Sequence, residues 1–394
     1  MDAPSDDRKD RDDPPDGADR DDPPDGAGDT GAGWRSALPG IVATVLMSAV
    51  VWLWVFWSLG EMFYEGWGPP FPHPLLYLIP GAATLGLTLA ALRWPRFGGT
   101  FLVLVGAWFG IWWIGNSLRA GVAVGDLAVR FLLSGGIALF GLLFLLEARH
   151  RRRRTEAGWT PPESWWRRNV RYLFLLVPAG LILLGYLVYW VPILATRVDD
   201  GDRGARLVEG NGVTLVWAPE GPGWNWRQDF GGFPSWDAIA WYGREPVGMK
   251  NGRERDSLRA AGRLPDDATL ADMRSTGLCR HLSADGLRLE SEPPGIWRMP
   301  TARELVRSLA LHGENAGCAL DPGFPDVEYT RAACDVTPDK ETPLWAPDLE
   351  PIYYWVADEH GEKEAFYVNY QGAIRAQPKR WGNPRHGYRC VRDP

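Results

Sequence analysis

Five long runs of apolar residues dominate the first half of the chain. They cover residues 38–59, 75–92, 98–118, 128–147 and 172–196. Charged side chains are rare in all five runs, and about 20 apolar residues in a helix cross a hydrocarbon core of ~30 Å. We therefore expect an all-α membrane bundle of five transmembrane helices within residues 34–196. The second run is the shortest and contains Pro80, so whether it fully crosses the bilayer stays open at this point.

After residue 202 the apolar runs shorten, and Gly, Pro, Trp and charged residues intermix. Strands are predicted at residues 213–217, 352–356, 364–370 and 388–392. Helices are predicted at residues 235–242 and 270–282, and turns around Gly361 and Gly372. Because the helices precede a series of antiparallel strands, we expect one compact α+β domain over residues 202–394.

The first 33 residues fit neither pattern. The sequence DRDDPPDGA occupies residues 10–18 and repeats at residues 19–27, and the segment holds twelve Asp against four basic residues, a net charge of −8. Such a segment cannot bury enough apolar area to offset chain entropy, so we predict a disordered acidic tail. An acidic arm that docks on a basic partner is the alternative. Since the whole chain carries −7, the rest is nearly neutral, which disfavours nucleic acid as a partner.

The basic residues predict the orientation of the helices. The segment between the fourth and fifth runs is rich in Arg, whereas the segment after the first run has Glu61 and Glu65 but no Lys or Arg. Basic loops stay on the cytoplasmic side, so the N-terminus is expected inside and everything after Arg197 outside. Only five Lys occur among 42 basic residues, which favours a GC-rich bacterial genome and hence a bacterial plasma membrane.

Ionisable side chains inside membrane spans often mark transport paths. Asp126 and Arg130, near one end of the fourth run, are the candidates here. Their four-residue spacing suits an ion pair on one helix face, and Arg130 could extend toward the interface. We therefore interpret both residues as structural.

Residues 297–305 read WRMPTAREL, in which Thr301 and Glu304 have the spacing of a capping box. This segment resembles the WRLPT..EL signature of the DUF1566 family, also called the Lcl C-terminal domain. The segments YYW at 353–355, FYVNY at 366–370 and YRCVR at 388–392 resemble further motifs of that family. The resemblance covers about residues 270–392, is weaker over residues 211–242, and includes none of the apolar runs.

The resemblance implies a C-type-lectin-like fold for the C-terminal domain, distantly similar to formylglycine-generating enzymes. In that fold the motif residues are expected to be structural; they are Trp297, Arg298, Pro300, Thr301 and Glu304.

The four cysteines, Cys279, Cys318, Cys334 and Cys390, all lie in the expected outside domain. An even count there suggests two disulfides, and the sequence alone allows three pairings. The resemblance implies a bridge from Cys279 to Cys390, which leaves Cys318 with Cys334. A zinc site is the rival interpretation, but no C-x-x-C spacing supports it.

Aromatic residues in or beside Gly/Pro-rich loops are the candidate ligand contacts. They are Trp224, Trp226, Trp345, Tyr353 and Trp381. Their rings could stack on sugars or fill hot-spot pockets, and the alternative is that they pack into a loop-rich core. Residues 321–350 are Pro-rich and acidic, and we expect a solvated loop there, with loose calcium binding as the alternative. No cofactor, resident metal or catalytic residue is otherwise predicted.

These features together favour a polytopic membrane protein that displays a non-catalytic, lectin-like recognition domain outside the cell. Its expected partners are the lipid bilayer and an extracellular glycan or protein ligand. An oxidative enzyme of the formylglycine-generating type is one alternative, and it would need reactive cysteines. A membrane signalling protein that uses the outer domain as its sensor is the other.

Overall fold

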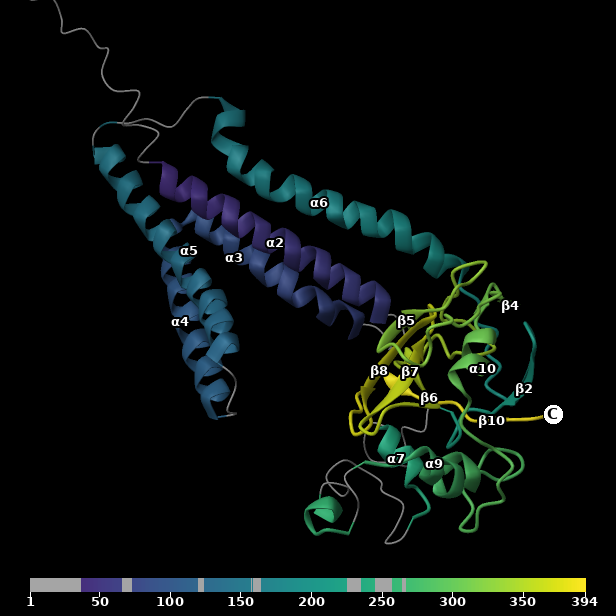
Figure 1. The fold of residues 1–394 in the computed structure, drawn as a ribbon. Helices are drawn as coiled ribbons and strands as arrows, with labels where there is room; N and C mark the ends of the chain where they lie inside the picture. Colours follow the sequence, from purple (N-terminus) through teal and green to yellow (C-terminus); the bar gives the residue numbers. More distant parts are fainter. Residues whose placement is uncertain are drawn as a thin grey trace, which may run out of the picture. The chain divides into compact units, whose positions relative to one another are not determined.

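The computed structural model describes residues 37–65, 73–119, 124–156, 158, 164–224, 235–244, 257–263 and 267–394 (Figure 1). The acidic repeat tail and Trp226 lie outside the described residues. The chain divides into two compact units. The first comprises Met1–Leu46 with Ala90–Arg168, and the second comprises Met47–Leu89 with Asn169–Pro394.

The N-terminal half consists of long apolar helices. They are α2 (Leu38–Glu65), the 3-10 helix η1 (His73–Leu78) that continues into α3 (Ile79–Arg93), α4 (Pro95–Arg119), α5 (Val124–Glu156) and α6 (Trp165–Thr196). In the described part of the chain, five helical segments are long and apolar enough to cross a membrane, in agreement with the five predicted runs. Pro80 lies in the first turn of α3, where a missing N–H is tolerated, so the second helix continues past it.

Small residues allow α4 and α5 to pack closely within the first unit. A Cβ added at Gly106 would lie 2.6 Å from the amide nitrogen of Ala138, and one added at Gly141 would lie 2.6 Å from the carbonyl oxygen of Gly99. Close backbone approach of this kind is typical of packed apolar helices. Arg130 of α5 donates to the hydroxyl of Ser117 on α4, so this cation is satisfied between the helices. The side chain of its expected partner, Asp126, lies outside the described residues.

The described residues of the C-terminal region form three β-sheets. The first has the order β1-β2-β10, formed by Arg206–Gly210, Val213–Trp217 and Val391–Arg392. The second is the hairpin of β3 (Ala310–Leu311) and β4 (Glu314–Asn315). The third has the order β5-β8-β7-β6-β9, formed by Tyr329–Arg331, Ala373–Pro378, Glu364–Asn369, Tyr353–His360 and His386–Gly387. All pairings are antiparallel except that of β9 with β6.

Short helices cover the strands. They are α7 (Trp236–Ala240), α9 (Leu270–Thr276), the 3-10 helix η2 (Leu278–His281) and α10 (Ala302–Arg307). The capping box predicted for α10 is present, since the Thr301 hydroxyl accepts from the amide of Glu304 and the Glu304 carboxylate accepts from the amide of Thr301. Helix α10 packs against β6 and β7, and α9 packs against β6.

Three predicted boundaries in this region are wrong. The helix expected at 270–282 ends at Gly277, because glycine favours helix termination and the chain continues as the 3-10 helix η2. Strand β6 extends to His360, beyond the expected 352–356, and the turn starts at Gly361 with a φ of +72°. The strand expected at 388–392 is reduced to Val391–Arg392.

Two disulfides connect the C-terminal region. Cys279 of η2 is bonded to Cys390, directly before β10, and Cys318 is bonded to Cys334. These are the pairs that the family resemblance implies. Because the chain has four cysteines, none is left as a free thiol.

Candidate functional site

Two of the five candidate ligand contacts are core residues. Trp224 and Trp345 are almost completely inaccessible, so the expectation that they meet a ligand is wrong. The indole N–H of Trp224 donates to the hydroxyl of Tyr354 at 2.6 Å, and the ring of Trp345 stacks on Tyr354 with centroids 3.8 Å apart. A loop-rich domain with short strands fills its interior with large aromatic rings, which is the physical reason for their burial.

The buried cation Arg389 completes this core. Its guanidinium lies 3.6 Å from the ring centre of Trp224 and donates to the carbonyl oxygens of Ala218 at 2.8 Å and Leu344 at 3.0 Å. Burial lowers the pKa of Arg389 to about 9, so the group remains charged at neutral pH. The resemblance YRCVR contains this residue, but the sequence carried no signal of its central role.

The structure brings Trp381 and Tyr353 together around one histidine. Trp381 is 43% exposed and Tyr353 is partly buried. Their ring centroids lie 5.2 and 5.1 Å from that of His386. These two residues are the part of the candidate set that a ligand could reach, and Trp226 lies outside the described residues.

His386 itself is enclosed. The ring is 1% exposed, stacks on Trp355 with centroids 5.0 Å apart, and has Nδ1 2.9 Å from the Oδ1 of Asn383. The same Asn383 oxygen accepts a hydrogen bond from the main-chain amide of Arg385. Because this atom is an acceptor, Nδ1 of His386 carries the proton and donates to it. Burial, aided by the charge of Arg385, lowers the pKa of His386 to about 3, so the ring is neutral at neutral pH. No local sequence pattern singles out this histidine.

A second polar network joins the end of α2 to the strands within the same unit. Glu65 forms an ion pair with Arg385 and accepts a hydrogen bond from the hydroxyl of Tyr353 at 3.2 Å. Arg385 also donates to the hydroxyl of Tyr77 in η1 at 2.5 Å, and Asn369 donates to the hydroxyl of Tyr64. Tyr353 therefore contacts both this network and His386. The sequence analysis did not identify Glu65 or Arg385 as partners.

Asp321, Asp326, Glu328 and Asp335 of the acidic segment are exposed, as expected of a solvated loop, but Asp339 and Glu341 contact the end of α6. Asp339 accepts two hydrogen bonds from Arg197 at 2.9 and 2.8 Å, and the carboxylate of Glu341 accepts from the amide of Val198 at 3.1 Å. Both acids are buried. Among the described residues no three His, Cys, Asp or Glu side chains converge as a metal site, so these acids serve as structural anchors.

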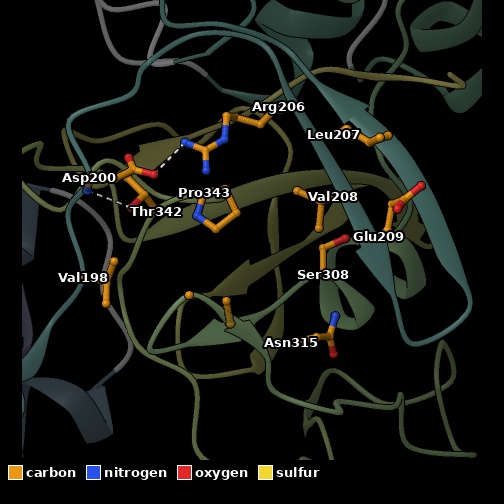
Figure 2. Close-up of a pocket in the computed structure, with 12 residues that line it drawn as sticks. Val198, Asp200, Arg206, Leu207, Val208, Glu209, Ser308, Asn315, Thr342 and Pro343 are labelled. Atoms are coloured by element: carbon orange, nitrogen blue, oxygen red, sulfur yellow. Dashed lines mark hydrogen bonds and ion pairs between the residues drawn. The ribbon is translucent and has the colours of Figure 1, made fainter.

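A polar slot lies between β1 and the β3–β4 hairpin (Figure 2). Its volume is about 350 Å³, within the usual range for ligand clefts. Figure 2 shows Arg206 directed toward Asp200, with which it forms an ion pair at 2.9 Å. Ser308 and Asn315 lie across the slot from β1. None of the aromatic candidates lines this slot, and the sequence analysis missed it.

The five motif residues have structural contacts. The indole N–H of Trp297 donates to a main-chain carbonyl at 2.9 Å, and Arg298 forms two hydrogen bonds to Glu304 at 2.8 and 2.7 Å. The carbonyl oxygen of Pro300 accepts from a β6 amide at 2.8 Å, and Thr301 caps α10. These contacts connect α10, β6 and the segment that follows η2.

Comparisons with protein families, with curated proteins and with solved structures find no match for this chain.

Proposed function

We propose that this chain is a polytopic membrane protein that displays a disulfide-bonded, lectin-like recognition domain outside the cytoplasm of a bacterium and binds its ligand without catalysis. The observation that carries the proposal is the pairing of all four cysteines in the C-terminal domain. Structural disulfides persist in oxidising compartments, and five apolar helices supply the membrane anchor. An odd number of crossings separates the basic loops from this domain.

The pairing also disfavours the oxidative-enzyme alternative. Enzymes of the formylglycine-generating type depend on reactive thiols, and a disulfide presents no thiolate. Recognition needs only an accessible surface with fixed polar groups, and the slot beside β1 and the exposed ring of Trp381 provide one.

A sensor role is the second candidate, favoured by the network of Glu65, Arg385 and Tyr353. A domain held only by a flexible linker would not need an ion pair to α2. If the protein is a sensor, ligand binding should change hydrogen exchange in the last turn of α2. Unchanged exchange there at saturating ligand would leave anchoring as the role of the helices.

Thiol labelling of intact cells tests the proposal. A membrane-impermeant maleimide should label the wild-type chain only after mild reduction, because the disulfides then release thiols on the outer side. The matched control is Thr155→Cys, which adds a free thiol to the Arg-rich end of α5 and should react only after permeabilisation. Labelling of the wild type without reductant would contradict the disulfides. Labelling of the reduced wild type only after permeabilisation would contradict the outside placement.

A further inference from the structure

Strand β1 is the edge of its sheet. It pairs with β2 through a two-residue turn at Asn211 and Gly212, whose φ angles are +50° and +76°. Such a turn places the flanking residues Gly210 and Val213 in a hydrogen-bonded pair. On its other side β2 pairs with β10, so β1 has one partner among the described strands.

The register determines which groups of β1 are left unpaired. Hydrogen-bonded and non-bonded pairs alternate in an antiparallel ladder. Gly210, Val208 and Arg206 therefore bond to β2, and the N–H and C=O groups of Leu207 and Glu209 point away from it. No hydrogen bond among the described residues engages these four groups. Leu207 and Glu209 both line the slot that β1 borders.

The charge and the exposed apolar surface beside this edge indicate which kind of partner strand would fit it. Among the residues that line the slot, the acids Asp200 and Glu209 outnumber Arg206, which gives a net charge of −1. Leu207 is 53% exposed, and its side chain lies on the same face of the strand as that of Glu209 (Figure 2). A partner strand would therefore meet an apolar position and an acidic position two residues apart.

We propose that an extended basic peptide segment of a partner protein adds to β1 as an antiparallel strand, with a basic and an apolar residue opposite Glu209 and Leu207. This names the partner class for the recognition role proposed above and rests on it. Strand addition supplies main-chain hydrogen bonds for affinity and alternate side chains for specificity. Because an antiparallel strand runs backwards along β1, the peptide order is basic, any residue, apolar. A second copy of this chain is disfavoured, since two acidic edges would repel each other.

The test uses the full chain in detergent micelles and a fluorescein-labelled heptapeptide, Ser-Thr-Lys-Thr-Val-Thr-Ser, with fluorescence anisotropy as the measurement. N-methylation of Lys and Val removes the amides that would face β1, and binding should weaken at least tenfold. N-methylation of the Thr residues removes amides that point away, and binding should stay within about twofold. Equal effects of the two modifications would overturn strand addition.

Variants of the chain test the same contact from the other side. Leu207→Pro removes an edge N–H that makes no ladder bond to β2, so the sheet should persist while peptide binding weakens at least tenfold. Leu207→Ala keeps that N–H and should bind within a few-fold of wild type. Glu209→Gln should weaken binding of the Lys peptide several-fold, whereas Glu290→Gln, an exposed acid away from the slot, should not.

Two further results would overturn the proposal. One is equal affinity for the same peptide with Glu in place of Lys. The other is a dimeric chain that Leu207→Pro converts to a monomer, which would assign the edge to a second copy. These measurements use solubilised protein and do not depend on membrane orientation, so failure of peptide binding and failure of the labelling experiment are distinguishable.

Discussion

His386 shows how a single buried side chain makes the fold sensitive to acid. Its pKa is about 3 in the folded chain and about 6.5 in an unfolded chain. Between these values the unfolded chain binds more protons, so stability is fully present above pH 6.5 and is lost as the pH falls. We expect the free energy of unfolding to drop by about 1.6 kcal/mol between pH 6.5 and pH 5. Thermal unfolding followed by tryptophan fluorescence measures this change.

The variants His386→Phe and His312→Asn separate this effect from general acid sensitivity. Phenylalanine keeps the aromatic packing but cannot bind a proton. The unfolding midpoint of His386→Phe should therefore lose most of its pH dependence between pH 6.5 and pH 5. His312 is exposed and has a φ of +53°, which asparagine tolerates, so His312→Asn should behave like the wild type. If the unfolding midpoint of His386→Phe still falls with pH as in the wild type, groups other than His386 cause the acid sensitivity.

At single residues, the sequence predicted local hydrogen bonding better than it predicted whether a side chain is buried. The spacing of Thr301 and Glu304 specifies a capping box because both partners lie within one helical turn. Whether Trp224 or Trp381 is buried depends instead on segments far away in the chain, such as the one that brings Arg389 under the Trp224 ring. Gly and Pro neighbours are shared by both tryptophans and could not distinguish them.

At the scale of elements, the ion pair between Arg197 and Asp339 fixes the end of α6 to the C-terminal domain. Both side chains are at most 10% exposed, so removing one partner leaves a buried charge unpaired. We expect Arg197→Met and Asp339→Asn each to lower the free energy of unfolding by roughly 3 kcal/mol. The double variant should lose much less than the sum, which a double-mutant cycle in thermal or chemical unfolding measures.

The exposed pair Arg152 and Glu156 on α5 provides the matched control. Their side chains are 67% and 60% exposed, and a solvated pair four residues apart contributes at most about 0.5 kcal/mol. The same cycle with Arg152→Met and Glu156→Gln should therefore give a coupling energy near zero. A comparably small coupling between Arg197 and Asp339 would show that the α6 connection is not held by this pair.

The apolar helices could be predicted from sequence because each run is long enough to specify its element without help from the rest of the chain. The short strands β1, β5 and β8 were missed, since strands of this length depend on their partners for stability. The turn Asn211-Gly212 is the local signal that could have identified the β1–β2 hairpin. The slot beside β1 could not be predicted, because β1 and the β3–β4 hairpin are about 100 residues apart in the chain.

For the whole molecule, the two disulfides should contribute unequally to stability. The bridge from Cys279 to Cys390 closes a loop of 111 residues, and that from Cys318 to Cys334 closes one of 16. Loop-closure entropy gives about 5 and about 3 kcal/mol for the two bridges. Replacing Cys279 and Cys390 together by Ser should therefore lower the free energy of unfolding more than replacing Cys318 and Cys334.

The comparison of the two bridges also tests which contacts stabilise the C-terminal domain. The 111-residue loop includes α10, all five strands of the third sheet and the shorter bridge, so the longer bridge connects both ends of the domain core. Denaturant unfolding of the two double-Ser variants measures which one loses more unfolding free energy. The wild-type chain in reductant lacks both bridges, so it should unfold at a lower denaturant concentration than either variant. Equal or reversed losses would mean that core packing around Trp217 and Trp355 already fixes the ends of the loop. In that case the bridges would add little beyond protection against local opening.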